Sequence, residues 1–228
     1  MRVILLSAGL GQRLRPITNN VPKCLVEIKG IPLLQVWLDR LTQEDLGPFL
    51  VNTHYLHNQV NDFIDISSYR EHVKLVHEPI LLGTAGTLRK NIDFFEGEDG
   101  LLIHADNYCL ANFNEFIEAH ENRPSNCLMT MMTFRTETPS SCGIVELDEN
   151  NVVVGFHEKV DSPPDNLANG AIYILSKELI EILKADGSMI DFSNEVLPDL
   201  VGKIYTYETQ ETFIDIGTPD TYKKANKL

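Results

Sequence analysis

The sequence is poor in basic residues and in long apolar segments, and each shortage excludes a class of protein. Its 228 residues include 19 Lys and Arg against 33 Asp and Glu, a formal net charge of −14. A general nucleic-acid binder relies on a basic face that neutralises phosphates, so a nucleic-acid partner is not expected. No apolar run approaches the roughly 20 residues of a membrane span, so a membrane partner is not expected either.

Cysteine is also scarce, and its spacing carries no signature. The four cysteines show no C-x-x-C pair, which argues against a disulfide framework or a common zinc site. The apolar residues 3–6 form too short a stretch for a secretory signal. A chain of this length buries enough surface to fold without disulfides. The sequence therefore predicts a reduced, cytoplasmic protein.

Positive charge is concentrated near the N-terminus. Residues 1–40 carry six Lys or Arg and only two acids, a net charge of +4, so the other 188 residues carry −18. A basic segment in an acidic protein indicates a local site for an anion and not a basic surface.

The hydrophobic pattern alternates between strand and helix periods through residue 123. Strands are expected at residues 2–6, 49–52, 73–76 and 101–104. Helices are expected around residues 34–41, 60–64 and 84–89, and after Asn112, a predicted N-cap with Glu115 as its capping partner. This alternation is typical of βαβ units with a mainly parallel sheet and helices on both faces.

The second half is richer in strands. They are expected at residues 128–134, 143–147, 152–157, 171–175 and 204–207, with helices at 177–184, at 192–200 and after Pro219. No repeat or low-complexity linker interrupts the pattern. The sequence predicts one α/β domain over residues 1–228, with an antiparallel-rich second half.

The loop after the first strand reads SAGLGQRLRP, from Ser7 to Pro16. Glycines let a backbone approach a phosphate closely, and Arg13 and Arg15 could add charged hydrogen bonds. The loop lacks the Gly-Lys-Ser/Thr ending of a P-loop and the third glycine of the dinucleotide fingerprint. By itself it is compatible with a plain β-to-α turn or with a phosphate site. Lys23, after Pro22, suits a phosphoryl-transfer centre.

Six segments in order resemble the sugar-1-phosphate nucleotidylyltransferase family. The N-terminal loop and the following Pro-Lys resemble its G-x-G-T/S-R-L-x-P…P-K signature, and LGTAG at residues 82–86 resembles its loop beneath the nucleotide. The other matches are HADN at 104–107, EK at 158–159, NGAIY at 169–173 and FIDIGTP at 213–219. The resemblance implies a Rossmann-like, GT-A-like domain with a mixed, mostly parallel sheet flanked by helices. The chain would be the catalytic domain without the C-terminal β-helix that many relatives append.

The resemblance also implies a reaction and a set of site residues. The family joins a nucleoside triphosphate to a sugar 1-phosphate and releases pyrophosphate, a step that needs positioning and charge neutralisation. The implied catalytic residues are Arg13, Lys23 and Asp106. The implied magnesium ligands are Asp106 and Asp215, with Mg²⁺ as the cofactor.

Two further groups of residues are implied to bind the substrates. Those expected at the nucleotide are Leu6, Ala8, Gly9, Gly11, Arg13, Glu78, Gly83 and Thr84. Those expected at the sugar phosphate are Gly143, Glu158, Lys159, Asn169 and Gly170.

The nucleotide base and the sugar stay open at this stage. The stretch from Glu78 to Gly86 looks most like guanylyltransferases for mannose or heptose phosphates, which favours GTP. Alternatives are a uridylyl-, thymidylyl- or cytidylyltransferase of the same fold, and a catalytically silent nucleotide-sugar-binding homologue. A glycosyltransferase of related fold would place Asp-x-Asp where this chain has Asp106-Asn107-Tyr108. The oligomeric state is open, a homodimer included.

Overall fold

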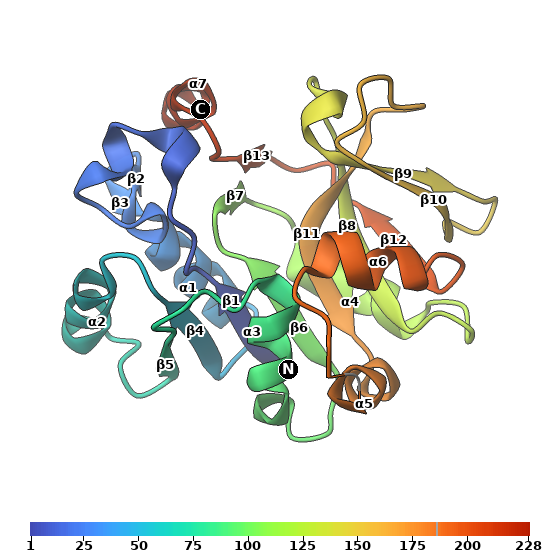
Figure 1. The fold of residues 1–228 in the computed structure, drawn as a ribbon, viewed down its shortest axis with the longest axis horizontal. Helices are drawn as coiled ribbons and strands as arrows, with labels where there is room; N and C mark the ends of the chain where they lie inside the picture. Colours follow the sequence, from blue (N-terminus) through green and yellow to red (C-terminus); the bar gives the residue numbers. More distant parts are fainter. Residues whose placement is uncertain (186) are drawn as a thin grey trace. The chain divides into compact units, whose positions relative to one another are not determined.

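The computed structural model describes residues 1–185 and 187–228, which form two compact units (Figure 1). The first unit contains Met1–Leu81, Ile103–Leu110 and Glu211–Leu228, and the second contains Leu82–Leu102 and Ala111–Gln210. The chain passes from one unit to the other four times, and one of these boundaries falls inside strand β6 (Gly100–His104).

Parallel strands form the centre of the first unit. β1 (Arg2–Leu6) pairs with β4 (Phe49–Thr53), which pairs with β5 (Val73–His77). The apolar residues of β1 and β4 are buried because a parallel sheet covered on both faces needs continuous hydrophobic strands. Parallel strands end at one common edge, and the segments that follow these three therefore emerge side by side.

Helices α1 (Leu33–Gln43), α2 (His57–Ile66) and α7 (Pro219–Lys227) complete this unit. α1 buries Leu34, Trp37, Leu38 and Leu41, which confirms the predicted apolar stripe. Short 3₁₀ turns follow β1 and precede α1, at Gln12–Leu14, Ile17–Asn19 and Lys23–Leu25. Thr218 and Thr221 form a capping box that starts α7.

Two small antiparallel pairs in this unit are absent from the sequence-based prediction. β2 (Glu27–Ile28) pairs with β3 (Ile31–Pro32), and β7 (Asn107–Cys109) pairs with β13 (Phe213–Asp215). The register of the second pair sets Asn107 opposite Asp215. Strands of two or three residues are too short to show a hydrophobic period, which explains why the sequence pattern did not reveal them.

The second unit is built mainly from antiparallel strands. These are β8 (Met129–Arg135), β9 (Gly143–Leu147), β10 (Val153–Glu158), β11 (Leu167–Leu175) and β12 (Ile204–Glu208). β9 pairs with β10 and β11, and β11 pairs with β8, all antiparallel; only the pairing of β8 with β12 among these is parallel. The predicted α/β fold with a mixed sheet and flanking helices is confirmed.

The helices of the second unit largely follow the prediction. They are α3 (Thr84–Lys90), α4 (Phe113–Glu121), α5 (Lys177–Ala185) and α6 (Leu197–Asp199), with 3₁₀ turns at Ile92–Phe95 and Pro139–Ser141. The Asn112 side chain accepts hydrogen bonds from the backbone N–H groups of Asn114 and Glu115, so the predicted N-cap is confirmed. The Glu115 carboxylate in turn accepts a hydrogen bond from the Asn112 side-chain amide.

Two elements of the second unit differ from the prediction. The expected helix at 192–200 is a π-helix, Phe192–Val196, followed by the short α6. Pro198 has no backbone N–H to donate, which interrupts the helical hydrogen bonds there. β11 begins at Leu167, before the predicted position 171. An irregularity between Asn169 and Tyr173 breaks the alternation of its side chains, so the sequence pattern did not reveal the first residues of the strand. No helix within residues 1–185 and 187–228 has the length and apolar character of a membrane span.

Candidate active site

The glycine-rich loop begins directly at the end of β1. Gly11 has a φ of 62°, in the left-handed region, and a Cβ there would lie 2.9 Å from Thr18 Cγ2. The Thr18 hydroxyl donates a 2.6 Å hydrogen bond to the Gly11 carbonyl and braces the turn. Glycine is therefore required at this position for both backbone conformation and space. Leu6 at the end of β1 and Ala8 in the loop are buried, whereas Gly9 is exposed.

Four predicted side chains of the first unit meet beside this loop. Lys23 Nζ lies 2.7 Å from Asp106 Oδ2 and 3.7 Å from Asp215 Oδ1. Arg13 Nη2 lies 3.9 Å from Asp215 Oδ2. The Lys23 side chain is 8% exposed, whereas the Arg13 side chain is 65% exposed. The arrangement thus combines a fixed, buried ammonium with a guanidinium that is free to reach into solvent.

The β7–β13 pair explains why the two aspartates are close. Asp106 directly precedes β7, and Asp215 is the last residue of β13, paired with Asn107. Further hydrogen bonds hold this pair in place: the Ile216 N–H donates to the Asp106 carbonyl at 3.3 Å, and Trp37 Nε1 donates to the Asn107 carbonyl at 2.9 Å. A backbone ladder therefore joins two carboxylates that lie far apart in the sequence.

The two carboxylates differ in their electrostatics. Burial would raise the pKa of Asp106, but the charges of Lys23 and His104 and the hydrogen bond from Lys23 bring it below its ordinary value. The pKa of Asp215 is raised, first by burial and then by the nearby Asp106 carboxylate, against the lowering effect of Lys23. The ammonium of Lys23 lies closer to Asp106 than to Asp215 and contributes to this difference.

The donor set fits a small, hard divalent cation. Mg²⁺ is bound in proteins through one or two carboxylates together with substrate phosphate oxygens and water. Asp106 and Asp215 provide two such carboxylates, and their side chains are 41% and 44% exposed toward solvent. Among the residues that the structure describes, no group of three or more His, Cys, Asp and Glu side chains is arranged to hold a metal.

These groups line one cleft of the first unit, with a volume of about 380 Å³. Residues 9–14 form one wall, and the other lining residues are Lys23, Leu81, Asp106 and Gly217. A Cβ at Gly217 would lie 2.9 Å from Asp215 Oδ2 and 3.1 Å from Arg13 Nη2. The cleft thus offers loop amides, two cationic side chains and the Asp106 carboxylate, and Asp215 lies beside it within 3.9 Å of Arg13 and Lys23. A metal-bound polyphosphate requires groups of these kinds.

Glu78, predicted at the nucleotide, is buried in the first unit with 1% exposure. It directly follows β5, and its carboxylate oxygen Oε1 accepts a 2.9 Å hydrogen bond from Asn52 Nδ2. Gly83 and Thr84 belong to the second unit, at the start of α3. Gly83 has a φ of 76° and faces the Ile190 backbone, and the Thr84 hydroxyl accepts a 2.7 Å hydrogen bond from the Phe192 N–H.

The residues predicted at the sugar phosphate meet in two places of the second unit. Gly143 on β9 lies opposite Glu158 on β10, and a Cβ at Gly143 would be 2.5 Å from Glu158 Oε2. Lys159 Nζ lies 2.6 Å from Glu158 Oε1. These three residues form one cluster of backbone, carboxylate and ammonium groups.

Asn169 and Gly170 lie at the irregular part of β11. Asn169 Nδ2 donates a 2.8 Å hydrogen bond to the Tyr173 hydroxyl, and Asn169 Oδ1 accepts one from the Ala171 N–H at 2.8 Å. Ala171 has a φ of 53°, a conformation that costs energy for a residue with a Cβ. Burial raises the pKa of Tyr173, so its hydroxyl acts as a neutral hydrogen-bonding group.

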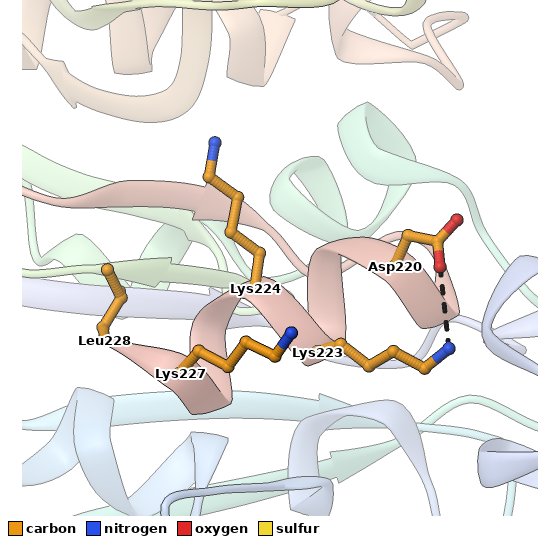
Figure 2. A pocket seen from close by; sticks show the side chains of 5 residues that line it. All are labelled: Asp220, Lys223, Lys224, Lys227 and Leu228. Atoms are coloured by element: carbon orange, nitrogen blue, oxygen red, sulfur yellow. Dashed lines mark ion pairs between the residues drawn. The ribbon is translucent and has the colours of Figure 1, made fainter.

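Another hollow of the first unit lies along α7. Asp220, Lys223, Lys224, Lys227 and Leu228 line it, and Figure 2 shows the ion pair between Asp220 and Lys223. The exposed lysine side chains extend from the helix, and no buried polar group accompanies them among the residues that line this hollow. The cleft with Lys23 and Asp106 is therefore the better candidate for an active site.

Sequence reasoning missed several residues that shape the candidate site. Gly217 permits the close approach of Arg13 and Asp215, and its signal lay in the FIDIGTP segment. Leu81 supplies an apolar part of the cleft. Asn52 anchors the first residue of the loop, with Oδ1 accepting a 2.7 Å hydrogen bond from the Ser7 N–H. A lone Asn in an apolar strand gave the only sequence signal for that contact.

Comparisons with known proteins identify the family of the chain. The family model described as nucleotidyl transferase matches residues 2–228. The chain is 26% identical to the D-glycero-alpha-D-manno-heptose 1-phosphate guanylyltransferase of Aneurinibacillus thermoaerophilus, over 100% of this chain and 97% of that protein. It is 28% identical to the catalytic subunit beta of mannose-1-phosphate guanylyltransferase from Drosophila melanogaster, over 97% of this chain. The chain spans about 60% of that relative's length.

A solved structure has the same fold along almost the whole chain. The crystal structure of HddC from Yersinia pseudotuberculosis complexed with GMP-PN matches with a TM-score of 0.83 and 25% identity, and covers 99% of this chain and 98% of that one. The family match extends over nearly every residue of the chain. This chain is a member of the nucleotidyl transferase family.

Proposed function

We propose that this protein transfers a guanylyl group from GTP to a hexose or heptose 1-phosphate and releases pyrophosphate. The observation that carries the proposal is the position of Lys23, whose ammonium contacts Asp106 and faces Asp215 within the glycine-rich cleft. The guanylyltransferase names of similar proteins support GTP and a sugar 1-phosphate as substrates.

In this proposal, each cationic group of the cleft has one task. An oxygen of the sugar phosphate attacks the α-phosphorus of GTP, and the bond from that phosphorus to the bridging oxygen of the departing pyrophosphate breaks. Lys23 neutralises charge on the α-phosphate in the transition state, because its buried ammonium is already held in place. The more exposed Arg13 binds the leaving pyrophosphate. The amides of the loop around Gly9 and Gly11 bind the phosphate chain.

Residues of the second unit would contact the acceptor, the sugar 1-phosphate. The Gly143 backbone and the Glu158 carboxylate are suited to sugar hydroxyls, and the Lys159 ammonium to the sugar phosphate. Asn169 and Gly170, at the irregular part of β11, would provide further polar contacts to the sugar. Hydrogen bonds to sugar hydroxyls let such a site reject analogues that lack the hydroxyl.

The proposed cofactor is a divalent metal ion, Mg²⁺ by preference, held by Asp106 and Asp215. When bound, it would neutralise negative charge on the phosphates and help to orient them. Lys23 contacts both proposed ligands and would keep their carboxylates in place before substrate binds.

The test is a pyrophosphate-release assay on the purified chain. GTP, UTP, dTTP, CTP and ATP are each combined with mannose, glucose and heptose 1-phosphates, with Mg²⁺ or with EDTA. We expect turnover with GTP and a manno-configured sugar phosphate, lost in EDTA. Turnover with UTP, dTTP or CTP instead would assign the alternative base. Binding of a nucleotide sugar without turnover in any combination would identify a silent homologue.

Three further statements belong to this proposal and stay predictions. They are that residues 1–228 act as one catalytic domain, that the protein works in the cytoplasm, and that it can form a homodimer. Light scattering of the purified chain measures the last of these directly.

A further inference from the structure

A chain of buried and partly buried hydrogen bonds crosses three strand ends of the first unit. Ser7 follows β1, Asn52 lies near the end of β4, and Glu78 follows β5. The register pairs Leu6 with Asn52 and Thr53 with His77, so the three residues lie at the same edge of the sheet. Asn52 and Glu78 are 3% and 1% exposed, which is unusual for such polar side chains.

Asn52 holds Ser7 through two hydrogen bonds. The Ser7 N–H donates to Asn52 Oδ1 at 2.7 Å, and the Ser7 hydroxyl donates to the Asn52 carbonyl at 2.5 Å. Ser7 is the first residue of the glycine-rich loop, and residues 9–14 of that loop line the cleft. The side chain of Asn52 thus determines how the loop leaves the sheet.

Glu78 holds Asn52 in turn. Its Oε1 accepts a 2.9 Å hydrogen bond from Asn52 Nδ2. Its own backbone is fixed on both sides, because the Glu78 N–H donates to the Thr53 carbonyl at 2.8 Å and the Glu78 carbonyl lies 2.6 Å from His54 Nδ1. The buried Glu78 carboxylate thus extends from a fixed backbone and accepts from the Asn52 amide.

The chemistry of the three groups allows one orientation of the Asn52 amide. The carboxylate of Glu78 can only accept, and the N–H of Ser7 can only donate. Asn52 must therefore present its NH₂ to Glu78 and its oxygen to Ser7. The reversed amide would bring two donors together at Ser7 and two acceptors together at Glu78, and each buried mismatch is costly.

We propose that Glu78 and Asn52 are positioning residues that orient the phosphate-binding loop through Ser7. Glu78 sets the Asn52 amide, Asn52 fixes the Ser7 backbone, and Ser7 directs the loop amides toward the triphosphate. This inference rests on the proposed function and assigns Glu78 a role behind the loop, whereas its predicted role was a contact with the nucleotide.

The donor and acceptor roles of the two side chains can be swapped by nearly isosteric substitutions, and this swap tests the inference. Asn52→Asp brings a second carboxylate against Glu78, so the pair repels and the loop shifts. Glu78→Gln alone keeps an oxygen that can accept from Asn52. The double variant Asn52→Asp/Glu78→Gln reverses the polarity of the pair and restores a hydrogen bond, because the new amide donates to the new carboxylate, which still accepts from Ser7.

The readouts are the KM for GTP, the KM for the sugar 1-phosphate and the hydrogen-exchange rate of the Ser7 amide. For Asn52→Asp we expect the KM for GTP to rise about tenfold to a hundredfold, the scale of a lost hydrogen bond to a charged group. The KM for the sugar phosphate should stay unchanged, and the Ser7 amide should exchange faster. The double variant should return both altered quantities to within about threefold of the wild type, by the same donor–acceptor match.

Two outcomes would overturn the inference. One is a double variant no better than Asn52→Asp in both readouts. The other is a change of base preference in Glu78→Gln that persists in the double variant, since this would place Glu78 against the base. Val60→Ala, which opens a cavity under α2, controls for lost stability and should leave the KM for GTP unchanged.

Failure of the proposed function gives a different result. If the wild-type chain releases no pyrophosphate with any substrate pair, the assignment as a transferase fails. The exchange rate of the Ser7 amide in the same three variants still tests the Ser7–Asn52–Glu78 network, because it requires no turnover.

Discussion

Lys23 Nζ lies 2.7 Å from Asp106 Oδ2, across 83 positions of sequence, and the lysine side chain is 8% exposed. Pro22, in an extended conformation, directs the chain into the 3₁₀ turn that carries Lys23. The β7–β13 ladder sets Asp106 in front of it. A buried cation needs such a partner to offset its desolvation, so the ion pair and the cleft are formed by the same contacts.

Lys23→Ala should lower the rate constant of pyrophosphate release by about 100-fold to 1,000-fold, the scale observed when one charge-stabilising donor is removed from a transition state. GTP should still bind, because the loop amides and Arg13 remain. Steady-state kinetics with GTP and a sugar 1-phosphate, together with calorimetric binding of GTP, measure both quantities. Lys74→Ala, an exposed lysine on β5, is the matched control and should keep full activity. Normal turnover in Lys23→Ala would contradict the role.

Asp106→Asn and Asp215→Asn should each raise the Mg²⁺ concentration needed for half-maximal activity by tenfold or more, roughly the effect of losing one charged ligand. Titrating MgCl₂ at saturating GTP gives this value for each variant. Asp62→Asn removes an exposed carboxylate on α2 and should not change the titration. An unchanged metal requirement in both aspartate variants would show that the ion binds elsewhere.

Gly143→Ala should weaken the sugar-phosphate subsite. The added Cβ would lie 2.5 Å from Glu158 Oε2 and 2.8 Å from Phe156 Cζ, so both side chains must move. We expect the KM for the sugar 1-phosphate to rise at least tenfold, roughly the cost of forcing one extra methyl group into a packed site, with the KM for GTP unchanged. Gly187→Ala, which meets no atom within 4 Å, is the control. Equal increases in both KM values would argue against a sugar-specific role.

The stability of the protein should fall in acid because of the buried His120 and the half-buried Asp99 beside it. Burial lowers the pKa of His120, so the unfolded chain takes up this proton more readily once the pH drops below about 6.5. The free energy of unfolding should therefore decrease from that pH downward until the folded histidine is also protonated. His120→Gln should flatten this part of the curve of Tm against pH.

Asp99 adds a second pH range, at more acidic pH, in which the free energy of unfolding should decrease. His120 Nε2 lies 3.3 Å from Asp99 Oδ2, and the interaction between these two side chains lowers the pKa of the carboxyl despite partial burial. The stabilisation is present above the unfolded pKa of about 3.9 and is lost as the pH falls through the lower folded value. Urea unfolding from pH 7 to pH 3 measures the free energy of unfolding over both pH ranges. A curve for His120→Gln that is parallel to the wild type throughout would rule out the pair as their source.

Much of the fold could be predicted from local patterns. The helical spacing of four apolar residues predicted α1 (Leu34, Trp37, Leu38 and Leu41), and Asn112 predicted the start of α4. Both signals lie in or next to the helix that they predict. Gly11 indicated a turn, and its left-handed φ shows why glycine is needed there. Lys23, Asp106 and Asp215 were named as site residues through their resemblance to family motifs.

Only the tertiary structure decided how those residues meet. β7 and β13 have three residues each, too few to show a period, and their pairing joins segments about a hundred positions apart. The roles of Asn52 and Glu78 depend on which strand ends lie together and on which atoms donate and accept. The sequence by itself therefore determined the local elements and the chemical types of the site residues. The long-range backbone pairing decided their geometry, because hydrogen-bond distance and charge separation are set by neighbours in space.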